Sequence, residues 1–319
     1  MTAFLLCIAL VAGVAAYVGW ASHWIAQGAS AWWFIVGAPI VYFTPAFVLV
    51  TLWFSLVWIW RTPRPPETRL GFASTMKLYW TEIWTVGMSW ILMALHRLLI
   101  SNPSPAPAQR PVVLIHGVLV NDGVWFFVRR FLARRGIAPL YTINYGPPLG
   151  DIESFAEQLK SKIEEALSAT GADRVVLVAH SMGGLVARAY LRRFGGERVA
   201  KLITIGTPHH GSILAFTFPG RCLGQMHPGN AWLAELNRNE EAPAPVPIIS
   251  IWSRHDSMVA PQASAELAGA ENIALVGIAH NALLGDKGVL DVVMAEIATC
   301  QQTGAGSKWR VVRPLSDPM

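Results

Sequence analysis

Charged residues and cysteines are scarce in this sequence. Charged residues make up 14% of the 319 positions and hydrophobic residues 53%, a balance too apolar for an ordinary soluble enzyme. Three cysteines, Cys7, Cys222 and Cys300, are too few for a disulfide framework. A single disulfide bond between Cys222 and Cys300 remains an alternative, but it could form only if the domain that contains both cysteines lies outside the cytoplasm.

Sets of metal ligands and nucleic-acid motifs are also missing. His209 and His210 are adjacent, but no further ligands follow at a suitable spacing, which favours a structural turn. Four arginines form one face of a predicted helix, which we interpret as solvated, with attraction to anionic lipids as the alternative: Arg129, Arg130, Arg134 and Arg135. We expect no metal, no cofactor and no nucleic-acid partner.

The N-terminal region has the composition of a membrane segment. It contains no Lys, Arg, Asp or Glu before Arg61, and ten of the 14 tryptophans lie in the first 100 residues. Two apolar runs, at about 3–24 and 31–60, are each long enough to cross a bilayer, which takes about 20 residues. The second is longer than one span needs, so it must tilt, kink or extend into the interface. A cleaved signal peptide is disfavoured, because the first run lacks a basic start and a second apolar run follows at once.

Residues 78–100 are predicted to form a third helix with one polar face. Glu82, Thr85, Ser89 and His96 recur at helical spacing among Leu, Ile, Met and Trp. This pattern favours an interfacial helix that lies on the membrane. A third span, whose polar stripe would face protein, is the alternative.

The charges after the second apolar run predict its orientation. The short break near residue 28 has no basic residue, whereas four follow the run: Arg61, Arg64, Arg69 and Lys77. The positive-inside rule therefore places residues 61–77 in the cytoplasm. Two spans leave the remaining chain in the cytoplasm and three place it outside. Our interpretation of residues 1–100 as a membrane region with two spans predicts a cytoplasmic C-terminal domain.

A change of composition marks the start of a second domain. Residues 101–111 form a Pro-rich linker. Residues 112–300 then alternate apolar strands with amphipathic helices, which predicts a mostly parallel sheet with helices on both faces. Asp151 is the expected N-cap of the longest helix and Gly171 its C-terminal stop. Residues 301–319 follow as a tail.

One serine stands where a buried strand must turn sharply into a helix. In VLVAHSMGGLVARAYL, residues 176–191, Ser181 is flanked by Ala179 and Gly183, whose small size lets the two backbones pass closely. This is the small-x-Ser-x-Gly nucleophile elbow, with alanine in place of the first glycine. The elbow projects a hydroxyl at the C-terminal edge of the sheet, where ligands bind in open α/β folds. We therefore predict that Ser181 is a catalytic nucleophile.

The candidates for the base and the acid come later in the chain. A serine hydroxyl needs a base, the base needs an orienting carboxylate, and the order on this fold is serine, acid, histidine. Asp256 and His280 each follow a predicted strand, so both are expected at the sheet edge that carries the serine. His255 remains an alternative base, although it precedes the acid. Two glutamates remain alternative acids: Glu197 and Glu235.

Two backbone N–H groups are candidates for an oxyanion hole. One belongs to Met182, directly after the nucleophile. The His116-Gly117 pair marks the loop after the first strand of the domain, which makes the N–H of Val118 the other candidate. We expect His116 and Gly117 to contact the substrate in this loop.

Residues 111–295 resemble the lipases of the α/β-hydrolase fold, in particular the bacterial triacylglycerol lipases and esterases. The motifs that carry the resemblance, in the family's order, are VVLIHG, VAHSMGGLVARAYL, TIGTPHHGS, HDSMV and GIAH. The resemblance implies the α/β-hydrolase fold and gives the serine, aspartate, histidine and two N–H groups named above the same roles. Some lipases of this group hold calcium through an aspartate after the catalytic histidine. Here Asn281, Ala282 and Leu283 follow His280, so calcium is not expected.

Residues 212–247 interrupt the strand pattern with glycine, proline and apolar residues. Their position in the family and their composition favour a lid over the acyl site, lined by Phe216, Phe218, Leu223 and Trp232. A long surface loop with its aromatic residues packed in the core is an equal alternative.

These features together predict a membrane-anchored serine hydrolase that cleaves acyl or lipid esters. The expected location is a bacterial inner membrane, with the catalytic domain in the cytoplasm, and the expected partners are an acyl-ester substrate and the bilayer. An acyltransferase that uses the same acyl-enzyme is one alternative. A catalytically silent membrane scaffold is another.

Overall fold

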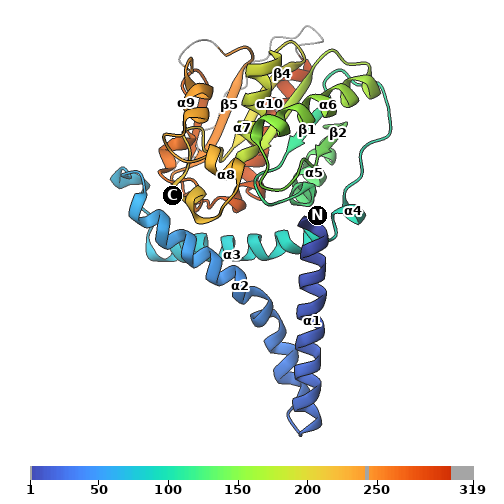
Figure 1. The fold of residues 1–319 in the computed structure, drawn as a ribbon, viewed down its shortest axis with the longest axis vertical. Coiled ribbons are helices and arrows are strands. Elements are labelled where there is room, and N and C mark those ends of the chain that lie inside the picture. The colour runs from blue at the N-terminus through green and yellow to red at the C-terminus, as the bar shows by residue number, and fades with distance from the viewer. Residues whose placement is uncertain (1, 241–243, 303–319) are drawn as a thin grey trace.

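The computed structural model describes residues 2–240 and 244–302, which form three long N-terminal helices and an α/β domain (Figure 1). Two of the helices extend away from the domain, and the third lies across its base. Residues 303–319, most of the predicted tail, lie outside the described residues, as do residues 241–243 of the predicted lid.

Helices α1 (Thr2–Ala26) and α2 (Ala31–Trp60) form a hairpin without Lys, Arg, Asp or Glu. A turn joins them at Gly28, whose φ of 95° suits glycine. Both helices are long and apolar enough to cross a membrane, and few of their residues are buried within the molecule. This distinguishes them from the core helices of a globular domain and leaves a large apolar surface uncovered.

The C-terminal end of α2 packs on the α/β domain. Val57 forms an apolar cluster with Leu214 and Ala260. Just beyond the helix, the Thr62 N–H donates a hydrogen bond to Gln262 Oε1 at 2.9 Å. The last turn of this 30-residue helix and the residues just after it therefore contact the domain.

Helix α3 (Phe72–Ala94) lies across the base of the domain (Figure 1). Glu82 is wholly buried in this contact. Farther along, Gly123 of the domain lies so close to α3 that a Cβ added to it would clash with the carbonyl oxygen of Leu92. Helix α3, with 23 residues, is long enough to cross a membrane but, unlike α1 and α2, is not apolar enough to count among the candidate spans of the described residues. A short helix, α4 (His96–Leu99), follows it.

One parallel sheet of six strands forms the centre of the α/β domain, in the order β2-β1-β3-β4-β5-β6. The strands are β1 (Val112–Ile115), β2 (Leu140–Ile143), β3 (Val175–His180), β4 (Val199–Ile205), β5 (Ile248–Ser253) and β6 (Glu271–Leu275). Because all the strands run in one direction, their C-terminal ends meet at one edge of the sheet.

Helices cover both faces of this sheet, which confirms the predicted fold class (Figure 1). One apolar core joins the sheet to α6 (Ile152–Thr170) and α7 (Met182–Phe194), and the other joins it to α5 (Phe126–Ala133) and α10 (Lys287–Gln302). Leu177 of β3 packs in the first core, whereas the residues on either side of it, Val176 and Val178, pack in the second, because side chains alternate along a strand. This is why the strands read as continuous apolar runs.

Helix α6 begins and ends at the residues that the sequence predicted. The side chain of Asp151 accepts a hydrogen bond from the Glu153 N–H at 3.0 Å, and Gly171 ends the helix with a φ of 69°. Both predicted terminal residues of this helix are therefore confirmed.

Residues 212–247 consist largely of short helices, namely η3 (Ile213–Thr217), α8 (Arg221–Gln225) and α9 (Ala231–Asn237). Four further short 3₁₀ helices lie elsewhere among the described residues: η1 (Pro66–Thr68), η2 (Asp122–Trp125), η4 (Gln262–Ala265) and η5 (Asn281–Leu284).

Cys222 and Cys300 lie on opposite faces of the sheet. Cys222 belongs to the core formed with α6 and α7, and Cys300 to the core formed with α5 and α10. The sheet between them excludes the disulfide bond that the sequence left open.

The close approach of α3 to the domain is testable by substitution of Gly123. We expect Gly123→Ala to lower the free energy of unfolding of the detergent-solubilised protein by about 1–3 kcal/mol, because the added methyl group must push α3 away. Thermal or denaturant unfolding measures the change. Gly224→Ala is the control, since a Cβ there meets no atom within 4 Å. Equal stability of the two variants would contradict the proposed tight contact.

Candidate active site

Ser181 lies in the sharp turn between β3 and α7, with φ 56° and ψ −130°, a conformation that is strained for any residue except glycine. Two glycines make room for this turn. A Cβ on Gly183 would lie 2.5 Å from the carbonyl oxygen of Ile115, and a Cβ on Gly117 would lie 2.9 Å from the Cβ of Ser181. The Ser181 N–H donates to the carbonyl oxygen of Ile205 at 2.9 Å. The turn thus holds the serine at the C-terminal end of β3.

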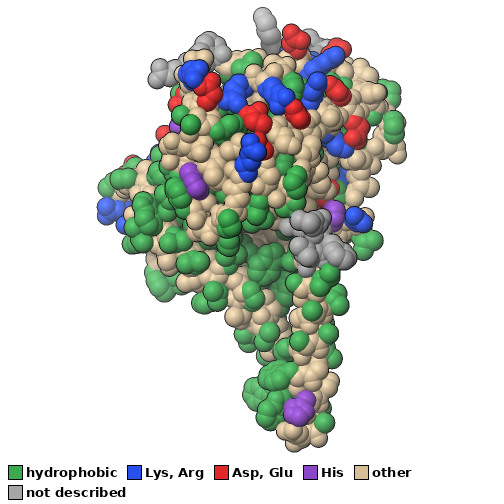
Figure 2. Space-filling view, in the orientation of Figure 1, with side chains coloured by type: hydrophobic (Ala, Val, Ile, Leu, Met, Phe, Trp, Pro, Cys, Tyr) green, Lys and Arg blue, Asp and Glu red, His purple; other side chains and the backbone are tan. Residues whose placement is uncertain are grey.

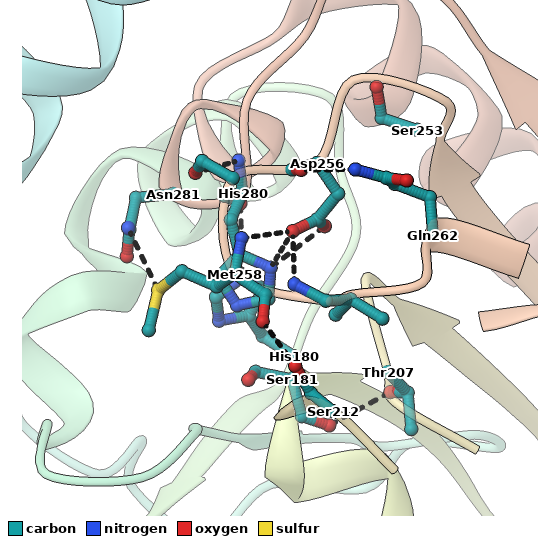
Figure 3. Close-up of polar contacts among 12 residues, drawn as sticks. His180, Ser181, Thr207, Ser212, Ser253, Asp256, Met258, Gln262, His280 and Asn281 are labelled. Atoms are coloured by element: carbon teal, nitrogen blue, oxygen red, sulfur yellow. Dashed lines mark hydrogen bonds and ion pairs between the residues drawn. The ribbon is translucent and has the colours of Figure 1, made fainter. Parts of the chain in front are cut away.

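His280 and Asp256 form a buried pair at the same edge of the sheet (Figure 3). The Nδ1–H of His280 donates to Asp256 Oδ2 at 2.9 Å, and each side chain is 2% exposed. Asp256 Oδ1 also accepts hydrogen bonds from the N–H groups of Met258 and Val259, both at 2.7 Å. These bonds fix the carboxylate, which in turn fixes the orientation of the imidazole ring.

The surroundings of His280 affect its pKa in opposite directions. Burial lowers it, whereas the Asp256 charge, the hydrogen bond to Asp256 and the Glu82 charge raise it. The result is a pKa above the usual histidine value. The imidazole of His280 therefore holds a proton more firmly than an isolated imidazole does. This property suits a group that must accept a proton during a reaction.

Ser181 and His280 line the same cavity, which has a volume of about 790 Å³. Figure 3 shows both residues and Asp256 in one cluster. Within the part of the chain that the structure describes, no hydrogen bond is formed by Ser181 Oγ, so its hydroxyl is available to a ligand in the cavity. A hydrogen bond between a nucleophile and its base often tightens only when substrate binds.

The predicted oxyanion donors flank the serine. Val118 lines the cavity beside Gly117, and Met182 is the first residue of α7. Neither of their N–H groups donates to another described residue. Both groups are thus available to an oxygen atom of a bound ligand.

His116 supports this loop from within the protein and does not line the cavity. Its ring stacks on Tyr145 at 4.3 Å, and its Nδ1–H donates to the carbonyl oxygen of Gly117 at 2.8 Å. Burial lowers the pKa of His116 to about 4, so the ring is neutral at physiological pH. Of the two residues expected to contact substrate here, the structure places only Gly117 at the cavity.

The four residues predicted to line the lid divide into two pairs. Phe218 and Leu223 line the cavity. Phe216 is 62% exposed and stacks on His227 instead. Trp232 packs against the core beside α6 and donates from Nε1 to Glu153 at 2.8 Å. Phe218 and Leu223 thus lie where the lid interpretation expects them, Trp232 lies where the alternative expects it, and Phe216 fits neither.

The alternative base and acids stand outside the cavity that Ser181 and His280 share. His255 is buried, and its Nδ1 accepts a hydrogen bond from the Gly277 N–H at 3.2 Å. Glu235 forms an ion pair with Arg238 on α9. Glu197 stands just before β4, at the edge of the sheet opposite Ser181. None of the three lines the cavity.

The two adjacent histidines face different partners. The ring of His209 lies 3.3 Å from Arg188 and from Thr204, whereas His210 Nε2 lies 2.9 Å from the carboxyl group of Glu240. Among residues 2–240 and 244–302, no group of three or more His, Cys, Asp or Glu side chains is placed to hold a metal ion.

Two further residues at the site were not predicted as functional. His180 lines the cavity, and its Nε2–H donates to the carbonyl oxygen of His280 at 3.3 Å. Glu82 of α3 accepts hydrogen bonds from residues that directly follow Asp256 and His280. The only signal for Glu82 in the sequence is an acidic residue on the polar face of an otherwise apolar helix.

Comparisons with known proteins agree with this fold. A family model described as alpha/beta hydrolase fold matches residues 110–246. A triacylglycerol lipase of Burkholderia plantarii is 33% identical over 137 residues, which cover 40% of this chain and 38% of the relative. A triacylglycerol lipase of Pseudarthrobacter phenanthrenivorans is 36% identical over 118 residues, 34% of this chain and 36% of the relative. The chain thus matches less than two fifths of the length of either relative.

Solved structures show the same architecture. The mature form of the Bacillus licheniformis lipase BlEst2 superposes with a TM-score of 0.54 at 19% identity, over 62% of this chain and 96% of that one. Aspergillus fumigatus lipase B superposes with a TM-score of 0.55 at 19% identity, over 64% and 57% of the two chains. The fold is that of the α/β hydrolases. Within that class, the chain resembles lipases and esterases, as its motifs predicted.

The raised pKa of His280 gives a test with an alkyl fluorophosphonate, which modifies serines that are activated by a base. We expect the labelling rate of Ser181 to rise with pH around a midpoint above about 6.5, because the imidazole must be neutral to accept the proton. Asp256→Asn removes the largest influence that raises this pKa, so the midpoint moves to lower pH and the rate falls by about 10³–10⁴-fold. Glu235→Gln is the control for the alternative acid. If the Asp256→Asn variant kept both the wild-type midpoint and the wild-type labelling rate, Asp256 would neither raise the pKa of His280 nor orient its ring.

Proposed function

We propose that this protein is a membrane-anchored serine hydrolase that cleaves carboxylic esters of lipids. The observation that carries the proposal is the strained Ser181 at the edge of a parallel sheet, in one apolar cavity with a histidine whose far nitrogen is paired to a buried aspartate. This arrangement supplies a nucleophile, a base and an orienting acid.

The reaction begins when Ser181 Oγ attacks the ester carbonyl carbon and His280 Nε2 takes the hydroxyl proton. Asp256 holds the Nδ1–H of the imidazolium that forms. The Val118 and Met182 N–H groups bind the oxyanion of the tetrahedral intermediate. When the carbon–oxygen bond to the alcohol breaks, His280 returns the proton to the leaving oxygen.

The second half of the reaction uses the same groups. His280 takes a proton from a water molecule, which attacks the carbonyl carbon of the acyl-enzyme. A second tetrahedral intermediate forms in the same oxyanion hole and collapses. The carboxylic acid leaves, and the proton returns from His280 to Ser181 Oγ.

The choice of lipid esters is supported by the cavity and by the relatives. Apart from the catalytic groups, the cavity is lined mainly by Leu, Val, Met, Trp and Phe side chains. Its volume of about 790 Å³ falls within the about 300–1,000 Å³ of small-molecule sites. The two curated relatives described above are triacylglycerol lipases.

The N-terminal helices support membrane anchoring. In the view of Figure 2, the charged side chains gather on the end of the domain farthest from α1 and α2, and hydrophobic side chains dominate the helical end. We place α1 and α2 across the bilayer and α3 at its surface, where the exposed Trp80 and Trp84 suit the lipid–water boundary. With two spans and basic residues after the second, the domain lies on the cytoplasmic side.

The central test is hydrolysis of p-nitrophenyl esters by the detergent-solubilised protein. We expect Ser181→Ala to lower kcat by at least about 10³-fold, because the nucleophile is lost while binding is retained. Release of p-nitrophenol measures the rate. Ser161→Ala is a matched control on the exposed face of α6 and should keep the wild-type activity.

Two outcomes would redirect the proposal. If folded wild-type protein neither hydrolyses the esters nor reacts with a fluorophosphonate, the domain binds without turnover. If an added alcohol acceptor diverts the acyl group from free acid to a new ester, the acyl-enzyme serves acyl transfer. We expect free acid as the main product.

A further inference from the structure

The cavity that contains Ser181 has one wall outside the α/β domain. Leu49 and Trp53 of α2 line it, together with Trp84, Met88 and Leu92 of α3. Helix α2 is one of two helices, within the described residues, that are long and apolar enough to span a membrane. The space around the serine is therefore continuous with the surface of a membrane helix.

The two helices form this wall jointly because they pack tightly on each other. The ring of Phe43 rests against Gly87, where an added Cβ would clash with it, and Tyr42 Oη donates to the Gly87 carbonyl oxygen at 2.7 Å. Phe43 also stacks on Trp84 with ring centroids 5.3 Å apart. Aromatic rings thus form most of this contact between α2 and α3, next to the residues that line the cavity.

Lys77, Thr81, Thr85 and Ser89 are the polar residues of α3 at the cavity, and two of the three hydroxyl groups are bonded within the helix. Thr85 Oγ1 donates to the Thr81 carbonyl oxygen at 2.8 Å, and Ser89 Oγ donates to the Thr85 carbonyl oxygen at 2.7 Å. Hydroxyl groups bonded in this way present little unmet polarity to a ligand. The wall suits a hydrocarbon chain better than a polar group.

We propose that the acyl chain of the substrate lies in the cavity against this wall and enters the cavity from the bilayer. The enzyme then takes its ester from the membrane that holds α1 and α2. This second proposal rests on the proposed function, and it adds that the bilayer is the source of the ester substrate. A lipid that moves along α2 and α3 to Ser181 keeps its acyl chain out of water throughout, which removes the penalty of exposing a long apolar chain.

The first experiment narrows the cavity at Met88. We expect Met88→Trp to lower the hydrolysis of p-nitrophenyl palmitate by about tenfold or more, relative to p-nitrophenyl acetate, because the larger ring fills space needed only by the long chain. Met76→Trp makes the same change on α3 at a position that does not line the cavity, and it should alter neither rate. An equal effect of Met88→Trp on both esters, or no effect, would overturn the proposal.

The second experiment separates the bilayer from other sources of the ester. The full chain is reconstituted in phosphatidylcholine vesicles, and p-nitrophenyl palmitate is placed either in the same vesicles or in separate ones. We expect an initial rate at least about tenfold higher when enzyme and ester share a bilayer, because only then can the chain reach the cavity without crossing water. Equal initial rates would overturn the proposal.

These outcomes differ from a failure of the proposed function. If p-nitrophenyl acetate is not hydrolysed in a Ser181-dependent way, the serine hydrolase mechanism itself is wrong and this inference falls with it. If acetate hydrolysis persists while chain length and vesicle arrangement have no effect, only the membrane source is wrong.

A separate observation concerns Glu82, the wholly buried acidic residue of α3. Its carboxyl group accepts from Ser257 Oγ at 2.8 Å, from Asn281 Nδ2 at 2.8 Å, and from the N–H groups of Asn281 and Ala282, each at 3.1 Å. Ser257 Oγ in turn accepts from the His280 N–H at 3.2 Å. One side chain of the helix therefore ties together the two loops that carry the acid and the base.

We also infer that Glu82 is a positioning residue, which holds Asp256 and His280 in register through the residues that follow them. Three ionisable groups face the His280 side chain from three elements: Asp256 after β5, His180 at the end of β3 and Glu82 on α3. Burial and the neighbouring His280 hold the pKa of His180 well below its usual value, so His180 stays neutral. The charges that influence the base are thus those of Asp256 and Glu82.

The test compares Glu82→Gln with Glu82→Ala in the hydrolysis of p-nitrophenyl acetate. Both substitutions remove the charge, so we expect the acidic limb of the kcat profile to move to lower pH in both. We expect kcat to fall, by up to about 10²-fold for alanine and less for glutamine, which keeps one acceptor oxygen, while KM changes little. Glu67→Gln, a change at an exposed acidic residue, is the control.

A merely structural role predicts another result. If both Glu82 variants lose folded protein but keep the wild-type kcat and pH midpoint per fluorophosphonate-reactive site, Glu82 stabilises the fold without positioning the pair. Wild-type kcat and pH midpoint in fully folded variants would equally overturn the inference. Failure of the wild type to hydrolyse the ester at all would instead refute the proposed function.

Discussion

The contact between the Glu82 carboxyl group and the loops after Asp256 and His280 is the constraint on which the site depends. A buried carboxyl group without hydrogen bonds is very costly, and here the bonds come from the α/β domain and not from the helix that carries Glu82. Helix α3 can therefore pack on the domain only in one register. That register also sets which of its side chains face the cavity, so one polar contact fixes both the loops and the wall.

The sheet supplies the other half of the site. Parallel strands bring the ends of β3 and β5 to one edge, and the elbow at Ser181 keeps a strained conformation because Gly117 and Gly183 leave room for it. The sheet and its two cores form a rigid base, whereas α2 and α3 form a wall that the resemblance to lipases does not cover. The protein thus combines the sheet edge of an α/β-hydrolase fold with a cavity wall that comes from two N-terminal helices.

The limits of sequence reasoning are clear at particular residues. Periodicity predicted the parallel sheet and its helices, because burial on both faces leaves continuous apolar strands, and the elbow motif together with chain order picked out Ser181, Asp256 and His280. Aromatic composition did not separate Phe218, at the cavity, from Trp232, in the core. Both are large apolar side chains in one irregular segment, and no periodicity there indicates which way each points.

The sequence by itself determined the fold class, the two long apolar helices and the order of the candidate catalytic residues, since each follows from local patterns of apolar and small residues. Only the tertiary structure decided that α3 closes the cavity, that His116 supports a loop without lining the site, and that Glu82 joins the helix to the loops. The reason is physical: these properties depend on contacts between segments as far apart as 200 residues along the chain, and local pattern carries no information about which distant groups will satisfy a buried polar atom.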